Sequence, residues 1–264
     1  MWNDWLTIGP LTIHGYGVCI AVGLLLALTV ACKRAKKIGL NDDIVYGIVF
    51  AAAIFGFMGA KIMYCIVEWD MFIKDPMSCL SSSGFVVYGG ITGGILAVFI
   101  YTKIKKVDFL EYLELCMPSV ALAQAFGRIG CFFAGCCYGR ETDSIIGITF
   151  HNSLYAPNDV KLVPTQLLSS LGDLINMALL LFISKHSKKK GTVTACYVIF
   201  YSIGRFIIEI FRNDVRGSVG KLSTSQFYGI FSLALGIALL LWVMLHKEKE
   251  VVTSLEEKEN NETV

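Results

Sequence analysis

Long apolar stretches separated by short polar segments occupy most of this chain. Nearly all are uninterrupted and low in charge, and they are long enough to cross a bilayer as helices. The alternating pattern of a β-barrel is not seen, so the sequence predicts an all-α fold. We expect a polytopic membrane helix bundle with about seven transmembrane helices. The predicted spans are 13–31, 44–67, 85–101, 109–133 (interrupted by polar residues), 165–184, 193–211 and 226–246.

The composition agrees with this pattern and excludes several classes of protein. The 264 residues are 55% hydrophobic and 17% charged, whereas soluble domains carry about 25% charged residues. This excludes a disordered chain, a basic nucleic-acid-binding domain and an ordinary cytosolic enzyme, so we expect membrane lipid and no nucleic acid among the partners. The length allows one transmembrane domain over 1–246, followed by a charged cytoplasmic tail over 247–264.

Basic residues gather in alternate loops, after the first, third and fifth predicted spans. Cytoplasmic loops of membrane proteins carry an excess of Lys and Arg, so these loops are expected to face the cytoplasm. The N-terminus is then outside and the C-terminus is cytoplasmic. No cleavable signal peptide is expected, because no basic segment precedes the first apolar run. The basic residues are Lys33, Arg34, Lys36, Lys37, Lys103, Lys105, Lys106, Lys185, Lys188, Lys189 and Lys190.

Charged residues inside spans are costly in lipid and usually face a cavity, so three of them are candidate site residues. Arg128 stands among glycines in the segment 127–140, and its guanidinium suits a phosphate or a carboxylate. Arg205 and Glu209 are four residues apart and can pair on one helical face. A purely structural ion pair is the alternative to a two-arginine anion pocket that includes Arg128.

Two further clusters have a structural and a functional interpretation. His14 and Tyr16 lie at the outer edge of the first span, where they form an interfacial aromatic belt or contact a lipid headgroup. Tyr88 precedes Gly89 and Gly90 in a glycine-rich run that packs closely on another helix or lets a headgroup approach. We favour a site role for Tyr88.

Three of the nine cysteines, Cys131, Cys136 and Cys137, cluster near the outer face. They serve either plain packing or a thiol function, which includes a disulfide, redox activity or a thiolate relay. Zinc sites usually contain repeated pairs of close cysteines, or such pairs joined to histidines. That spacing is absent here, so the sequence predicts no metal.

Several ordered motifs resemble those of the prolipoprotein diacylglyceryl transferases, which are bacterial membrane proteins with seven spans. The family pattern G-R-x-G-N-F-x-N-G-E-x-x-G resembles the segment 127–139, and the family element H-x-Y-G resembles His14, Tyr16 and Gly17. Further matches are Glu114, Pro118, Pro164, Thr165, Gln166, Tyr201, Arg205, Phe206, Glu209 and Arg212.

The chain also departs from the family pattern. The family H-G-G stands here as Tyr88-Gly89-Gly90, so the histidine is missing. The two Asn positions and the Glu position of the signature hold Cys131, Ala134 and Cys136. The arginines and glycines are retained, so the resemblance supports phosphate binding better than proton transfer.

The resemblance implies transfer of a diacylglyceryl group from phosphatidylglycerol to the lipobox cysteine thiol in the signal peptide of a preprolipoprotein. It places the chain in the bacterial inner membrane and implies no cofactor. Arg128 and Arg205 would bind the phosphate, and Tyr88 would donate a hydrogen bond, because a phenol is a poor base at neutral pH. The residues expected to bind substrate are His14, Tyr16, Gly89, Gly90, Gly139, Tyr201 and Glu209.

Two alternatives to this activity stay open at the level of sequence. One is a related membrane transferase that acts on another acceptor through a cysteine-based site at Cys131, Cys136 and Cys137. The other is a non-catalytic protein of the same fold that binds or transports phospholipid. Similarity of fold alone does not separate these functions.

Overall fold

A computed structural model describes residues 3–9, 11–82, 84–187, 189–214, 218–220 and 222–245. The predicted tail at 247–264 lies outside these ranges. Within them, seven helices are long and apolar enough to cross a membrane, which confirms the predicted helical bundle. These helices are α1 (Gly15–Lys37), α2 (Asp42–Val67), α5 (Val87–Lys105), α6 (Phe109–Ala134), α7 (Thr165–His186), α8 (Thr192–Phe211) and α9 (Thr224–Leu245).

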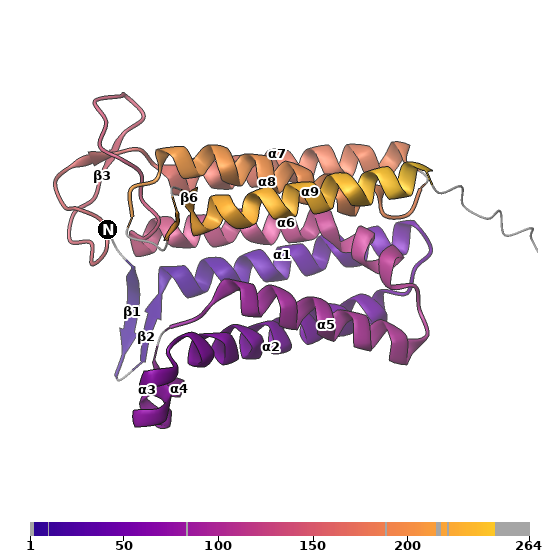
Figure 1. Cartoon of the computed structure of the whole chain (residues 1–264), viewed down its shortest axis with the longest axis horizontal. Coiled ribbons are helices and arrows are strands. Elements are labelled where there is room, and N and C mark those ends of the chain that lie inside the picture. Colours follow the sequence, from indigo (N-terminus) through magenta and orange to yellow (C-terminus); the bar gives the residue numbers. More distant parts are fainter. Residues whose placement is uncertain are drawn as a thin grey trace, which may run out of the picture.

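The helix α6 lies at the centre of the bundle. It packs against α1, α7 and α8, while α2 pairs with α5 and α9 pairs with α8 (Figure 1). Half of the α6 span (50%) is buried, compared with 11% of the α9 span. The polar residues that interrupt the apolar run of α6 can therefore face other helices instead of lipid.

Close packing of α2 against α5 depends on glycine. A Cβ atom added at Gly89 would lie 2.3 Å from the carbonyl oxygen of Gly59, and one at Gly93 would lie 2.6 Å from that of Phe55. Small residues at such crossings let two helix backbones approach each other. The glycine-rich run after Tyr88 therefore has a packing role.

The three basic loops lie at one end of the bundle, on the right in Figure 1. Arg34, near the end of α1, donates to the Ser184 hydroxyl of α7 at 2.8 Å. Glu114 of α6 accepts hydrogen bonds from the backbone N–H groups of Gly191 and Val193, at 2.7 and 2.8 Å. Glu114 thus caps the start of α8, where a carboxylate is favoured by the helix dipole.

The opposite end carries short elements that the apolar pattern does not predict. The connection 139–163 folds over a small core of Phe150, Ala156 and Leu162. Residues 13 and 14, which were predicted to begin the first span, instead end a strand. The short elements are the antiparallel pairs β1 (Asp4–Ile8) with β2 (Leu11–His14), β3 (Ile148–Thr149) with β4 (Lys161–Leu162), and β5 (Ser218–Val219) with β6 (Leu222–Ser223), and the helices α3 (Trp69–Lys74) and α4 (Pro76–Ser81).

Candidate active site

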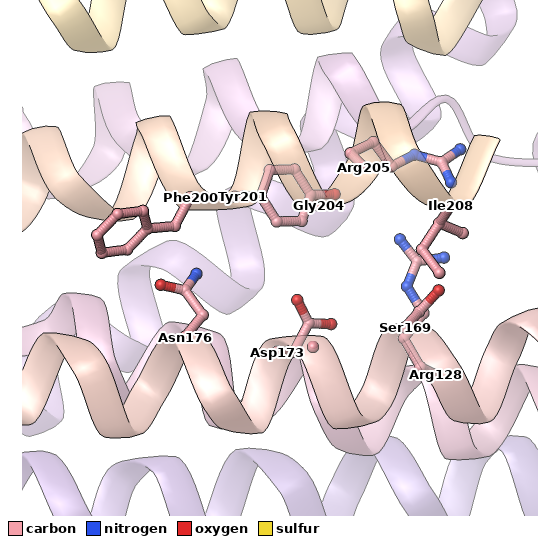
Figure 2. Close-up of a pocket in the computed structure, with 10 residues that line it drawn as sticks. Arg128, Ser169, Asp173, Asn176, Phe200, Tyr201, Gly204, Arg205 and Ile208 are labelled. Atoms are coloured by element: carbon pink, nitrogen blue, oxygen red, sulfur yellow. The ribbon is translucent and has the colours of Figure 1, made fainter. Parts of the chain in front are cut away.

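A small cavity of about 70 Å³ lies among α6, α7 and α8 (Figure 2). Apolar side chains and charged or polar side chains share its walls. Charged groups inside a span usually line a site for a ligand, so this cavity is the candidate active site. Its lining residues are Arg128, Ser169, Gly172, Asp173, Asn176, Phe200, Tyr201, Gly204, Arg205 and Ile208.

Two arginines from different helices reach this cavity. The guanidinium groups of Arg128 (α6) and Arg205 (α8) lie at the same end of it in Figure 2. Arg205 also donates to the Ser225 hydroxyl at 2.8 Å, which ties it to the start of α9. The structure therefore brings together the two arginines that the sequence selects.

The Glu209 carboxylate, which does not line the cavity, contacts the side chains of Arg205 and Arg212. This carboxylate is 1% exposed and lies 3.0 Å from an Arg205 nitrogen, one helical turn earlier. Arg212 lies 3.7 Å from the same carboxylate oxygen and donates to Asp214 at 2.9 Å. The predicted pair of Arg205 and Glu209 is thus part of a buried ionic network, which restricts the orientation of Arg205.

The sequence interpretation missed two polar residues of α7 that line the cavity, Asp173 and Asn176. They are 8% and 5% exposed, and in Figure 2 both point across the cavity, Asp173 toward Tyr201 and Asn176 toward the neighbouring Phe200. Among the residues that the structure describes, neither amide atom of Asn176 has a hydrogen-bond partner. Their signal in the sequence was a carboxylate and an amide three residues apart within an apolar span.

A sharp turn follows α6 and folds the chain back on itself. Gly135 adopts a left-handed conformation with φ of +73°. Its N–H bonds to the Phe132 carbonyl, and the N–H of Cys136 bonds to the Cys131 carbonyl, each at 3.2 Å. These two hydrogen bonds form a Schellman motif, which requires a residue that tolerates positive φ. The turn places Cys136 beside Cys131.

The turn gathers three thiols that the sequence only suggested as a group. The sulfur atoms of Cys131, Cys136 and Cys137 all lie within 4.8 Å of one another. The start of α7 fixes this backbone, because Thr165 donates to the Cys137 carbonyl at 2.7 Å and Gln166 donates to the Cys136 carbonyl at 2.8 Å. We call Cys131, Cys136 and Cys137 the thiol cluster.

Within the thiol cluster, Cys137 has an unusual backbone and cationic neighbours. Its φ is +60°, which non-glycine residues seldom adopt. Hydrogen bonds from Cys131 and Cys136, together with Arg212 and Arg128, lower the pKa of the Cys137 thiol. A thiolate is therefore favoured at Cys137.

Comparison with known proteins identifies the family. A family model described as "Prolipoprotein diacylglyceryl transferase" matches residues 4–242. The chain belongs to the prolipoprotein diacylglyceryl transferase family. The match covers every spanning helix except the last residues of α9, and it confirms the family predicted from the ordered motifs.

Curated relatives agree with this family. The phosphatidylglycerol–prolipoprotein diacylglyceryl transferase of Clostridium tetani is 46% identical over 228 residues, which cover 86% of this chain and 92% of that protein. Transferase 2 of Clostridium perfringens is 45% identical over 231 residues, covering 87% and 90%. The transferase of Clostridioides difficile is 34% identical over 233 residues, covering 88% and 91%. The chain is thus a multi-pass membrane protein of a transferase family.

Tyr88, which replaces the histidine of the prolipoprotein diacylglyceryl transferase pattern, lies on α5 beside the cavity. Its ring centroid is 4.2 Å from that of Tyr228 on α9. Its phenol interacts electrostatically with Arg205, although Tyr88 is not among the residues that line the cavity. Tyr88 is therefore placed at the edge of the arginine site.

His14 and Tyr16, the two residues of the H-x-Y-G motif that were predicted to bind substrate, lie in different surroundings. His14 bonds to Asp4 at 2.6 Å at the base of the N-terminal hairpin, and it does not line the cavity. Tyr16 packs on α6, where a Cβ atom at Gly130 would lie 3.1 Å from its ring. Tyr16 also interacts electrostatically with the thiol cluster and with Arg128. Tyr16, like His14, is not among the residues that line the cavity, and headgroup binding by either residue stays a prediction.

The three predicted glycines all make packing contacts. The N–H of Gly139 bonds to the Val163 carbonyl at 3.1 Å, which joins the long outer loop to the turn after α6. Gly89 and Gly90 lie at the α2–α5 crossing, where a Cβ atom at Gly90 would be 3.2 Å from the Gly56 carbonyl oxygen. Contact between these glycines and a lipid headgroup stays a prediction.

Proposed function

We propose that this chain transfers the diacylglyceryl group of phosphatidylglycerol to the lipobox cysteine thiol of a preprolipoprotein. The products are a thioether and glycerol phosphate. The observation that carries the proposal is the placement of Arg128 and Arg205, from two helices, on one cavity at membrane depth. A phosphodiester anion is a suitable partner for two guanidinium groups in a setting where unpaired charge is costly.

The two arginines would act on the leaving group. Negative charge develops on the phosphate as its bond to the diacylglycerol carbon breaks. Arg128 and Arg205 stabilise this charge, and the low dielectric of the span strengthens the interaction. Glu209, 3.0 Å from Arg205, fixes that guanidinium before the lipid binds, so little reorganisation is needed during the reaction.

The polar residues of α7 supply contacts for the rest of the headgroup. Phosphatidylglycerol carries a terminal glycerol whose hydroxyl groups both donate and accept hydrogen bonds. The Asp173 carboxylate can accept from such a hydroxyl, and the Asn176 amide can accept and donate. Because both residues share the cavity with Tyr201 and the arginines, they favour a polyol headgroup over a bare phosphate.

The charge distribution supports an orientation in the bacterial cell membrane. The basic loops gather at one end of the bundle, which the positive-inside rule places in the cytoplasm. The N-terminal hairpin and the thiol cluster are at the other end, so the acceptor cysteine would be modified at the outer face of the membrane. Apolar side chains such as Phe206 and Ile207 are exposed on α8, where they can contact acyl chains.

Complementation tests this proposal. The chain is expressed in a bacterium depleted of its own transferase, and lipoprotein N-terminal peptides are examined by mass spectrometry. We expect diacylglyceryl thioether on the lipobox cysteine, and the same from the control Arg140→Ala, whose side chain is exposed outside the cavity. A well-expressed chain that gives no thioether would contradict the proposal and favour lipid binding without catalysis, or another acceptor.

A further inference from the structure

The geometry of the thiol cluster fits a metal ion. The three sulfur atoms lie within 4.8 Å of one another. Zinc–sulfur bonds of about 2.3 Å in tetrahedral geometry place ligand sulfurs roughly 3.8 Å apart. A small closing movement of the side chains is therefore enough to bring all three sulfurs to coordination distance.

The backbone that carries these sulfurs is held in place before any ligand binds. The Schellman turn at Gly135 fixes Cys136 relative to Cys131. Thr165 and Gln166, each 1% exposed, anchor the carbonyl groups of the two adjacent cysteines. Supporting hydrogen bonds of this kind orient the ligands of metal sites and strengthen binding.

Neighbouring charge also favours a metal with three thiolates. A divalent cation with three thiolates has a net charge of about −1, from simple addition of the ligand charges. Arg128 and Arg212 both interact electrostatically with Cys137, and Arg128 also interacts with Cys131. These guanidinium groups compensate the negative charge of the occupied site, which lowers the cost of burying it.

We propose that Cys131, Cys136 and Cys137 bind a thiophilic divalent cation, with zinc as the best fit, and leave a fourth position open for the acceptor thiol. Soft thiolate ligands select zinc over the hard cations magnesium and calcium. Structural zinc sites have four protein ligands, whereas catalytic sites have three and an open position. Within the described ranges, the cluster contains only these three ligand residues.

The open position gives the metal a role in the transfer, and this part of the inference rests on the proposed function. The acceptor thiol binds as a thiolate and releases its proton to water. Its sulfur then bonds to the diacylglycerol carbon, whose bond to the phosphate oxygen breaks, and glycerol phosphate leaves with that electron pair. The metal is neither oxidised nor reduced. A metal-bound thiolate would not need the histidine that Tyr88 replaces.

Metal binding is tested on the full chain in detergent, without lipid or acceptor. The protein is purified with reductant, stripped by a chelator and titrated with zinc or with cobalt(II) as a spectroscopic probe. We expect about one ion per chain and a sulfur-to-cobalt charge-transfer band. Cys131→Ser and Cys136→Ser should weaken zinc binding by at least about 100-fold, whereas Cys196→Ser, at a cysteine in α8, should leave it unchanged.

Three outcomes of this titration would overturn the site. They are absence of stoichiometric zinc, zinc binding that survives both Cys131→Ser and Cys136→Ser, and a disulfide within the cluster that forms in place of metal binding. A variant that unfolds would also lose metal binding. The helical circular dichroism of each variant therefore serves as the control for folding. Cys131→Asp and Cys136→Asp, which keep an anionic ligand, should retain weakened cobalt binding without the full charge-transfer band.

The fourth position is tested with short lipobox peptides added to the cobalt-loaded chain. A cysteine peptide should change the cobalt spectrum, and the matching serine peptide should not. No change with the cysteine peptide would overturn the open position. A spectral change without any transfer product in phosphatidylglycerol vesicles would support the metal site and contradict the proposed function, so the two failures are distinguishable.

Discussion

At the scale of single residues, the central feature is a carboxylate between two guanidinium groups. Glu209 is 1% exposed, and it contacts Arg205 at 3.0 Å and Arg212 at 3.7 Å. A buried ion network of this kind contributes little net stability compared with an apolar core, but removal of one partner is costly. We therefore interpret Glu209 as a positioning residue for Arg205.

Replacement of Glu209 tests this positioning role. Glu209→Gln leaves two buried guanidinium groups without their shared carboxylate, which we expect to cost about 3–5 kcal/mol of stability. Thermal unfolding in detergent measures the loss. Transfer should fall as well, and Glu209→Asp should recover part of both properties. Unchanged stability and transfer in Glu209→Gln would contradict the role.

The arginines themselves should be indispensable. Arg128→Ala and Arg205→Ala each remove a cation that faces the leaving phosphate, so we expect kcat to fall by about 10²–10³-fold. The comparison is a steady-state transfer assay with the exposed control Arg140→Ala. Transfer at the unmodified rate in Arg128→Ala would exclude the assignment of that residue to the phosphate.

The sequence predicted these residues to different extents. The sequence revealed Arg128, Arg205 and Glu209 because a charged residue in an apolar span is rare and usually faces a cavity. Asp173 and Asn176 were missed because one carboxylate and one amide barely lower the mean hydropathy of the span. The convergence of Cys131 with the residues after Gly135 depends on one left-handed turn, which spacing alone does not predict.

At the scale of elements, the α2–α5 pair shows how membrane helices pack without an aqueous hydrophobic effect. Glycines on both helices bring carbonyl oxygens and α-carbons into contact. The seven spans were predictable because each needs about 20 apolar residues. The two-residue strands β3 to β6 were not, since pairs so short have no periodicity to detect.

This packing makes Gly89 sensitive to a single methyl group. Gly89→Ala would place a Cβ atom 2.3 Å from a backbone oxygen that cannot move freely, so we expect destabilisation of about 1–3 kcal/mol. Gly229→Ala on α9 is the matched control, because no atom lies within 4 Å of its added Cβ. Thermal unfolding that is equal for the two variants would exclude the close approach.

At the scale of the whole molecule, the separation of charge along the bundle predicts its orientation. The basic loops share one end, and the connection 139–163 lies at the other. An epitope inserted beside Leu154, which is 92% exposed, should react with antibody on intact spheroplasts. An epitope after Lys106 should react only after permeabilisation. The reverse pattern would invert the proposed orientation.

The most direct test of the account is transfer by the purified chain itself. Phosphatidylglycerol labelled in its diacylglycerol part is supplied in vesicles with a lipobox peptide, and mass spectrometry follows the peptide and the released glycerol phosphate. We predict thioether and glycerol phosphate in equal amounts, with no product from a serine peptide and about 10²–10³-fold slower product formation from Arg205→Ala. A folded chain that binds the lipid and releases neither product would contradict the central claim.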